Sequence, residues 1–254
     1  MKKILITRKL IKSSEDYASR VFDVKFNKED KVITKDDLVK NSSDCDGILS
    51  SLTEKIDAEV ISKLSNSIKI ISNFAVGFGN IDIIAAKKRN IIVTNTPDVL
   101  TDATAEIAML ILLGAARRAK EGIEWTKQKN WKWSADFLMG KQLTGARLGI
   151  LGMGRIGRAV ADRAKSFGMI IHYHNRSQLN KNLEKGAIYH NSLESLLSVS
   201  DFFSINCPAT NETKHIINKD TLKHFPDGAI LSNSARGDMI DDEAMVEALK
   251  NGKI

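Results

Sequence analysis

The 254-residue chain has only two cysteines, Cys45 and Cys207, and three prolines. The cysteines form no CxxC pair and belong to no cluster of metal-ligand residues, so the sequence predicts neither a disulfide scaffold nor a metal site. This usage is typical of a reducing compartment, and we expect a cytoplasmic protein. No uncharged apolar run reaches the ~18 residues of a membrane span. The basic start, MKKILITRKL, has an apolar stretch of only three residues and predicts a β-strand instead of a signal peptide.

Aromatic residues are also scarce, at 6% of the chain. Lys and Arg number 38 against 31 Asp and Glu, which gives a formal net charge of +7. A nucleic-acid-binding protein would concentrate such an excess in a stripe with aromatic platforms. Here the lysines are interspersed with acidic residues, as in NKEDK and TKDDLVK, which favours a solvated surface and argues against nucleic-acid binding.

The first hundred residues alternate short apolar runs with longer amphipathic stretches. The runs recur about every 20 residues, and helix-like segments lie between them, notably 57–64 and 81–89. This rhythm predicts βαβ units and a parallel sheet, hence an α/β fold. The expected strands are 3–7, 23–26, 47–51, 68–72 and 91–94.

The rhythm stops at Asn95-Thr96-Pro97, and we place a domain boundary near residues 97 to 100. A helix is expected from Thr101 to Arg118, with Asp102 near its start, where it suits the helix dipole. The segment is apolar almost all round, so we expect it to be buried between domains or subunits. From Gly145 the βαβ rhythm resumes.

The strongest local motif is a glycine-rich turn between a strand and a helix. A strand over 147–151 leads into Gly152-Met153-Gly154-Arg155-Ile156-Gly157, and a helix is expected over 158–167, followed by a strand over 169–174. In a G-x-G-x-x-G turn the first glycine permits the tight turn, the second lets the backbone approach a pyrophosphate, and the third lets helix and strand pack closely. The helix N-terminus then faces the phosphates. The alternative is a glycine-rich turn that binds nothing.

The residue that ends the second strand bears on the choice of dinucleotide. Proteins that bind NAD usually place Asp or Glu there to bond the ribose 2′-hydroxyl. This chain has Asn175, followed by Arg176 and Ser177. With no carboxylate to repel it, a 2′-phosphate can pair with the guanidinium and the hydroxyl, so we expect NADP, with NAD possible. The alternative is that Arg176 is a solvated loop residue.

Four segments together resemble the D-isomer-specific 2-hydroxyacid dehydrogenases, closest to the glyoxylate/hydroxypyruvate reductase branch. They appear in family order and span nearly the whole chain. The segments are NFAVGFGNIDIIAAKKRNIIVTNTPDVLTDATAE (73–106), LTGARLGILGMGRIGRAVA (143–161), INCPATNETKHIIN (205–218) and LSNSARGDMIDDEAMVEALKNGKI (231–254).

The resemblance implies two doubly wound parallel-sheet lobes. Residues 1–98 would form a flavodoxin-like substrate-binding lobe, and residues 99–254 a Rossmann NAD(P)-binding lobe that is incomplete at its C-terminus. The active site would lie in the cleft between them, where hydride passes between the nicotinamide and C2 of a small 2-oxo acid. Glyoxylate and hydroxypyruvate are favoured.

The resemblance also implies roles for individual residues. Val76 and Gly77 would hold the substrate carboxylate through backbone N–H groups, and Leu52 would lie near the small α-substituent; ordinary turn geometry and packing are the alternative. Arg236 would be the catalytic arginine, gripping the carboxylate and polarising the ketone oxygen; a structural salt bridge is the alternative.

Several further residues match positions that line the cofactor. No general base neighbours Cys207 in sequence, so we interpret it as a packing residue and not as a nucleophile. The full set of expected cofactor-binding residues is Thr104, Gly152, Gly154, Arg155, Ile156, Gly157, Asn175, Arg176, Ser177, Cys207, Pro208, Ser234 and Ala235.

Trp131 and Trp133 match the loop by which family dimers embrace, which implies a homodimer; the alternative is a hydrophobic loop tucked into its own domain.

One departure from the family concerns the proton donor. The family also needs a Glu about thirty residues beyond the arginine and a His some twenty further on, but only 18 residues follow Arg236. All five histidines precede Arg236 and match no catalytic position: His172, His174, His190, His215 and His224. We therefore expect an incomplete chain that is inactive alone. The alternative from another class is a non-catalytic dinucleotide-binding interaction module.

Overall fold

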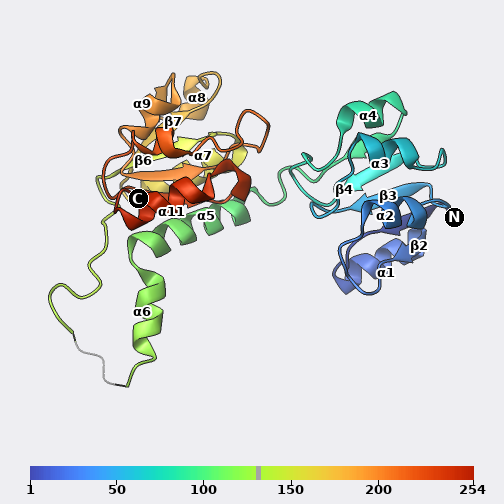
Figure 1. Cartoon of the computed structure of the whole chain (residues 1–254), viewed down its shortest axis with the longest axis horizontal. Helices are drawn as coiled ribbons and strands as arrows, with labels where there is room; N and C mark the ends of the chain where they lie inside the picture. Colours follow the sequence, from blue (N-terminus) through green and yellow to red (C-terminus); the bar gives the residue numbers. More distant parts are fainter. Residues whose placement is uncertain (130–132) are drawn as a thin grey trace. The chain divides into compact units, whose positions relative to one another are not determined.

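The computed structural model describes residues 1–129 and 133–254. The chain divides into two compact units, Met1–Val99 and Leu100–Ile254, next to the expected boundary (Figure 1). The substrate-binding and nucleotide-binding roles expected for them remain predictions. Both units are α/β structures with a five-stranded parallel sheet, so the predicted fold class is confirmed.

The first unit has the strand order β2-β1-β3-β4-β5, which is the flavodoxin-like order. Each expected strand is present within one to two residues of its expected bounds. The elements are β1 (Lys3–Ile6), α1 (Lys12–Val21), β2 (Asp23–Phe26), α2 (Lys35–Asn41), β3 (Gly47–Ser50), α3 (Ala58–Lys63), β4 (Ile70–Asn73), α4 (Ile83–Lys88) and β5 (Ile92–Thr94).

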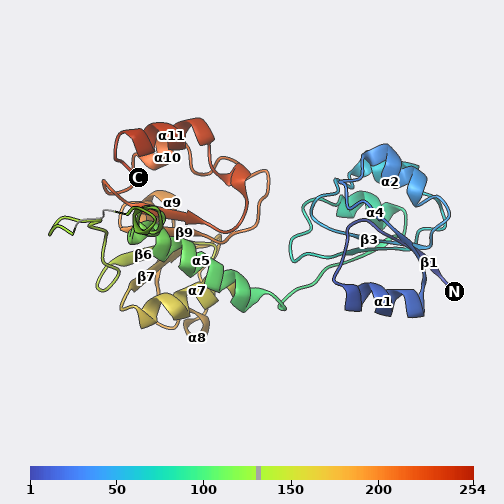
Figure 2. The same ribbon diagram turned by 90° about the horizontal axis from the view of Figure 1, so that it is seen from below.

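One face of this sheet carries the core of the first unit. Leu5, Ile48 and Ile71 point from the strands toward α2, α3 and α4, where Leu38 and Ile61 meet them. Asp57 and Asp82 cap α3 and α4 by accepting hydrogen bonds from Val60 N–H and Ala85 N–H, so each helix begins where a carboxylate can satisfy a free donor. Helix α1 lies on the opposite face (Figure 2).

The second unit has the order β10-β9-β6-β7-β8. Counted from its own first strand this is 5-4-1-2-3, the Rossmann order read from the other edge. The elements are α5 (Thr101–Ala116), α6 (Ala119–Thr126), β6 (Arg147–Leu151), α7 (Arg155–Ser166), β7 (Ile170–His174), α8 (Lys181–Glu184), β8 (Ile188–His190), α9 (Leu193–Leu197), β9 (Phe202–Ile205), α10 (Lys219–Leu222), β10 (Ile230–Asn233), a 3₁₀ turn (Gly237–Met239) and α11 (Asp242–Lys250).

Helices cover both faces of this second sheet (Figure 2). On one face α5 and α7 pack with Leu148 and Tyr173 of the strands. On the other, α9, α10 and α11 pack with Phe203 and Ile205. The second unit therefore has two hydrophobic cores, one on each side of its sheet.

The helix expected over 101–118 is shorter than predicted. It ends at Ala116, because Arg118 adopts a left-handed backbone conformation (φ 51°) and a separate helix, α6, follows. One side of α5 is buried, including Ala105 and Leu112, whereas Ile107 and Leu110 are 54% and 62% exposed. Within the described residues, no helix is long and apolar enough to cross a membrane.

Candidate functional site

The carboxyl ends of four strands bring most of the predicted cofactor residues to one edge of the second sheet. The glycine-rich turn follows β6, Asn175 follows β7, Cys207 comes two residues after β9, and Ser234 follows β10. All these strands are parallel, so their carboxyl ends meet at the same edge. The order reverses between β6 and β9, and ligands of open α/β sheets bind at such a reversal.

The glycines of the turn are required by close backbone contacts. Gly152 has φ 90°, and a Cβ there would lie 2.5 Å from the Cys207 backbone nitrogen. A Cβ on Gly157 would lie 2.3 Å from the Gly152 carbonyl oxygen. A Cβ on Gly154, in contrast, would meet no atom within 4 Å. The first and third glycines are thus needed for folding, while the second leaves open space where a pyrophosphate could approach.

Helix α7 begins at Arg155, three residues earlier than expected, with Gly154 as its N-cap. Gly154 has no side chain, so no side-chain hydrogen bond caps this end of the helix. The first N–H groups of the helix are then left for other acceptors. Among the described residues, no hydrogen-bond acceptor is found for the N–H groups of Ile156 and Gly157. These donors and the positive end of the helix dipole form a site suited to phosphate.

Asn175 connects the second strand to the glycine-rich turn. Its Oδ1 accepts a 2.7 Å hydrogen bond from Met153 N–H, and its backbone oxygen accepts one of 3.3 Å from the Tyr189 hydroxyl. Because Oδ1 is held by the turn, the amide offers N–H donors to a ligand. Arg176 and Ser177 are exposed, and no carboxylate of the described residues lies within ion-pair distance of Arg176. Its guanidinium is thus available to a phosphate.

Cys207 lies directly against the glycine-rich turn and is followed by the exposed Pro208. Burial raises the pKa of the Cys207 thiol to about 11, so the group is a neutral thiol near pH 7. This supports a packing role. Thr104, another predicted cofactor contact, lies half-buried in the first turn of α5.

The turn after β10 presents Arg236 at the same strand edge. Asn233 fixes this turn, since its Oδ1 accepts from Ala235 N–H (2.9 Å) and its Nδ2 donates to the Arg236 oxygen (2.7 Å). The exposed Arg236 guanidinium donates only to the Ala235 carbonyl, at 2.8 Å. In the part of the chain that the structure describes, no carboxylate pairs with it, which argues against the structural salt bridge.

In the first unit, the turn after β4 contains two N–H groups, of Val76 and Gly77, whose orientation is fixed by hydrogen bonds to neighbouring carbonyls. The carbonyls of three consecutive residues accept hydrogen bonds: Ala75 from Thr96 N–H (2.9 Å), Val76 from Asn95 Nδ2 (2.8 Å) and Gly77 from Asn73 Nδ2 (2.9 Å). In a trans peptide the N–H points opposite to the carbonyl. The N–H groups of Val76 and Gly77 therefore face away from these donors.

No acceptor lies within hydrogen-bond distance of these two N–H groups among residues 1–129 and 133–254. Adjacent unpaired N–H groups form a concavity that suits an anion. Leu52, the other predicted substrate contact, is 43% exposed after β3. The sequence indicated Val76 and Gly77 only through the family resemblance, and the three asparagine and threonine donors behind them were missed.

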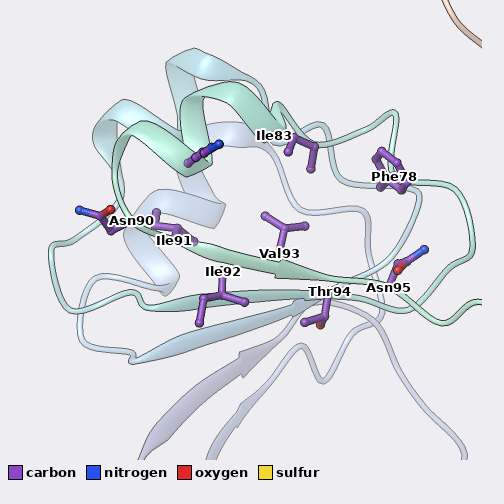
Figure 3. A pocket seen from close by; sticks show the side chains of 9 residues that line it. Phe78, Ile83, Asn90, Ile91, Ile92, Val93, Thr94 and Asn95 are labelled. Atoms are coloured by element: carbon purple, nitrogen blue, oxygen red, sulfur yellow. The ribbon is translucent and has the colours of Figure 1, made fainter.

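A groove of about 520 Å³ lies along the outer edge of β5, beside α4 (Figure 3). Its lining is mostly apolar, with Ile83 and Val93 on one side of the strand and Ile92 on the other. Its lining includes Phe78, from the turn after β4, and Asn95, which donates to the Val76 carbonyl of that turn. It offers neither the unpaired N–H pair nor an arginine, so we do not assign the reaction to it.

Three of the five histidines form a hydrogen-bonded cluster on β7 and β8. His172 Nδ1 lies 2.9 Å from His190 Nε2, and His174 Nδ1 lies 2.8 Å from the His190 carbonyl oxygen. His190 Nδ1 in turn lies 2.5 Å from Ser195 Oγ. Burial lowers the pKa of both His172 and His190. The cluster thus packs the sheet against α9.

Comparison with known proteins agrees with the strand order and the strand-edge residues. Residues 109–254 match the family "D-isomer specific 2-hydroxyacid dehydrogenase, NAD binding domain". The chain is 44% identical over 256 residues to a glycerate dehydrogenase of Hyphomicrobium methylovorum, covering 100% of this chain and 80% of the relative. It is 40% identical over 257 residues to a glyoxylate reductase of Thermococcus kodakarensis, covering 99% and 77%.

A solved structure gives the same result. It is a Polaromonas sp. JS6 66 protein assigned to the D-isomer specific 2-hydroxyacid dehydrogenases, with 43% identity and a TM-score of 0.92. The match covers 100% of this chain and 80% of that one.

Proposed function

Since the chain belongs to the D-isomer-specific 2-hydroxyacid dehydrogenases, we propose that it transfers a hydride between NADPH and C2 of glyoxylate or hydroxypyruvate, giving the 2-hydroxy acid. The observation that carries this proposal is the open space at Gly154, set between Gly152 and Gly157 at the start of α7. That arrangement fits a dinucleotide, because a pyrophosphate can approach the backbone there without a side chain in its way.

Different residues of the second unit would bind the pyrophosphate and the 2′-phosphate of the cofactor. The N–H groups of Ile156 and Gly157 would bind the pyrophosphate. Arg176 and Ser177 would bind the 2′-phosphate of NADP, and the N–H groups of Asn175 would add a donor. When bound, the dinucleotide supplies or accepts the hydride. The chain's own residues bind and orient it.

The substrate carboxylate would be held by the N–H groups of Val76 and Gly77. The carbonyls in the same two peptide planes, those of Ala75 and Val76, are held by hydrogen bonds from Thr96 N–H and Asn95 Nδ2. Arg236 would pair with the same anion and polarise the oxygen on C2, where negative charge develops. Its side chain has no competing carboxylate among the described residues. Leu52 would contact the α-substituent.

A fluorescence titration with NADPH and NADH tests the cofactor proposal. We expect tighter binding of NADPH by about tenfold or more, since a charge-assisted hydrogen bond contributes ~1.5–3 kcal/mol. Arg176→Ala should narrow this difference, whereas Arg20→Ala, an exposed arginine of α1, should leave it unchanged. Equal or tighter NADH binding would contradict the preference for NADP.

Residues 1–254 alone should reduce glyoxylate slowly, because none of them matches the proton donor of the family. Loss of a general acid costs about 10²–10⁴-fold in rate. The comparison is NADPH oxidation by this chain and by a chimera that carries the last fifth of the Hyphomicrobium relative. Faster turnover by the chimera supports the dehydrogenase. NADPH binding without turnover in either protein supports the alternative, a non-catalytic dinucleotide-binding module.

We further propose a homodimer that uses the exposed side of α5. Ile107 and Leu110 lie there, and Trp133 is 75% exposed, whereas Trp131 lies outside the described residues. Light scattering should give twice the monomer mass, and Leu110→Lys should shift the protein toward the monomer. A monomeric unsubstituted chain at micromolar concentration would contradict the proposal.

A further inference from the structure

Asn80 lies where two loops of the first unit meet. One loop, residues 51–54, follows β3 and presents Leu52; the other, the turn at 74–80, follows β4 and presents Val76 and Gly77. Asn80 Nδ2 donates to the Ser51 oxygen (2.9 Å) and to the Glu54 oxygen (3.0 Å). One amide group thus joins the second loop to two carbonyls of the first.

The same amide continues into the turn. Asn80 Oδ1 accepts a 3.2 Å hydrogen bond from Asn73 Nδ2, and that Nδ2 also donates to the Gly77 oxygen at 2.9 Å. Asn73 is fully buried, and its Oδ1 accepts from Ser50 Oγ at 3.0 Å. A continuous path of hydrogen bonds therefore runs from the Leu52 loop through Asn80 and Asn73 to the peptide plane that follows Gly77.

A buried carboxylate fixes the other end of this path. Glu54 is 1% exposed and accepts from Thr7 Oγ1 (2.8 Å), Ser51 N–H (2.8 Å) and Thr53 Oγ1 (2.6 Å). Burial raises the pKa of Glu54, but the hydrogen bonds from Thr53, Ser51 and Thr7 outweigh it, so that the pKa lies below its ordinary value. The charged Glu54 thus links the Leu52 loop to Thr7, the residue that follows β1.

From this network we propose that Asn80 is a positioning residue, which couples the Leu52 loop to the turn that carries the N–H groups of Val76 and Gly77, so that loop and turn act on a carboxylate ligand together. The inference rests on the proposed function of these N–H groups. A ligand that needs contacts from two loops binds more tightly when the loops are already ordered relative to each other. Without Asn80, each loop would be ordered separately at the expense of binding.

Asn80→Ala in the 254-residue chain is the test, with Asn27→Ala as its control. Asn27 Nδ2 likewise donates to two backbone carbonyls, those of Thr7 (2.8 Å) and Lys31 (2.7 Å), but these lie in the loops after β1 and β2. Asn80→Ala removes four side-chain hydrogen bonds of the first unit, and Asn27→Ala removes two. Both variants should lower the melting temperature, Asn80→Ala by more, and only Asn80→Ala should change ligand binding.

The probe is oxalate, a planar anion with two adjacent carboxylates, followed through the backbone amide resonances of Leu52 and Gly77. In the unsubstituted chain and in Asn27→Ala, both resonances should shift with one dissociation constant. In Asn80→Ala we expect binding about tenfold weaker, the size that loss of neutral hydrogen bonds produces. The Leu52 resonance should then no longer respond, which a merely stabilising role would not cause.

Asn80→Ser, which keeps a short hydroxyl donor, provides the same comparison if Asn80→Ala does not fold, and it should weaken binding by a smaller factor. Unchanged oxalate affinity with coupled shifts at Leu52 and Gly77 in a folded Asn80 variant would overturn this inference alone. No oxalate-dependent shift in the unsubstituted chain would overturn the proposed carboxylate site, and this inference with it.

Discussion

The two units share a parallel five-stranded sheet but differ in how its faces are covered. The second unit buries both faces, with separate clusters of buried side chains under α5 and α7 and under α9 to α11. The first has one such cluster, under α2 to α4. On its other face Ile70 and Ile92 are 37% and 61% exposed.

This difference shows that the same strand arrangement does not fix how much apolar surface is removed from water. Hydrophobic stabilisation is proportional to the area buried, so the second unit gains from two interfaces and the first mainly from one. Exposed apolar side chains on a sheet face or edge also invite association with other chains. We therefore expect the second unit to be the more resistant of the two to unfolding.

The largest effect should come from removing a large side chain from a doubly covered sheet. Phe202→Ala in β9, where the side chain is fully buried, should cost about 3–5 kcal/mol of unfolding free energy because it leaves a cavity. Ile92→Ala in β5 should change it by less than about 0.5 kcal/mol. Urea denaturation checks both values, and the fluorescence of Trp125 and Trp133, which lie in the second unit, follows the unfolding of that unit. Similar losses of unfolding free energy in Phe202→Ala and Ile92→Ala would contradict the proposed difference between the two sheets.

A smaller effect distinguishes two glycines of the second unit. Gly157→Ala should destabilise by about 1–3 kcal/mol, because its Cβ would collide with the Gly152 carbonyl oxygen. Gly154→Ala meets no such contact, so it should leave the melting temperature unchanged while weakening NADPH binding. Calorimetry and cofactor titration measure the two outcomes. Loss of stability in Gly154→Ala would show that its open space serves the fold and not a ligand.

The smallest effect concerns acid, which should weaken the second unit before the first. Burial lowers the pKa of His172 and His190 from the ordinary 6.5, so the unfolded chain takes up protons that the folded one resists. Stability of the second unit should therefore fall as the pH drops below 6.5. Around His172 the other charged groups are Arg147, which also lowers its pKa, and Asp201, which raises it.

In the first unit the pKa of Glu54 lies below its ordinary value of 4.5, so its contribution should persist until the pH falls below 4.5. Urea midpoints between pH 7 and pH 4 test the order. His190→Gln should flatten the decline of the second unit, whereas the exposed His224→Gln should not. If the urea midpoint of the first unit fell at a higher pH than that of the second, the expected order would be wrong.

The sequence predicted the sheets better than the helices around them. Strands of apolar residues stand out at regular spacing, so all five strands of the first unit were expected near their observed bounds. Helix α1 was not singled out in the sequence, and only Ala18 of its ten residues is buried. Helix α7 begins earlier than expected, because Arg155, Ile156 and Gly157 of the glycine-rich motif already belong to its first turn.

The candidate site was predicted where one local motif or the family resemblance specified it. The glycine-rich turn is contiguous in sequence, and its contacts follow from its spacing. The hydrogen bonds of Asn73, Asn80 and Asn95 join three separate loops, and no local pattern indicates which carbonyl each amide meets. Only the folded first unit brings these side chains together.

Because the chain has only two cysteines, one in each unit, their thiols can report local opening of each unit separately. One thiol, Cys45, is fully buried in the first unit, and the other, Cys207, adjoins the glycine-rich turn of the second. Burial raises the pKa of both, so an alkylating reagent should label each only when its surroundings open. Labelling rates at the two positions would then time local opening in each unit separately, and a dinucleotide that stiffens the turn would slow one rate while leaving the other unchanged.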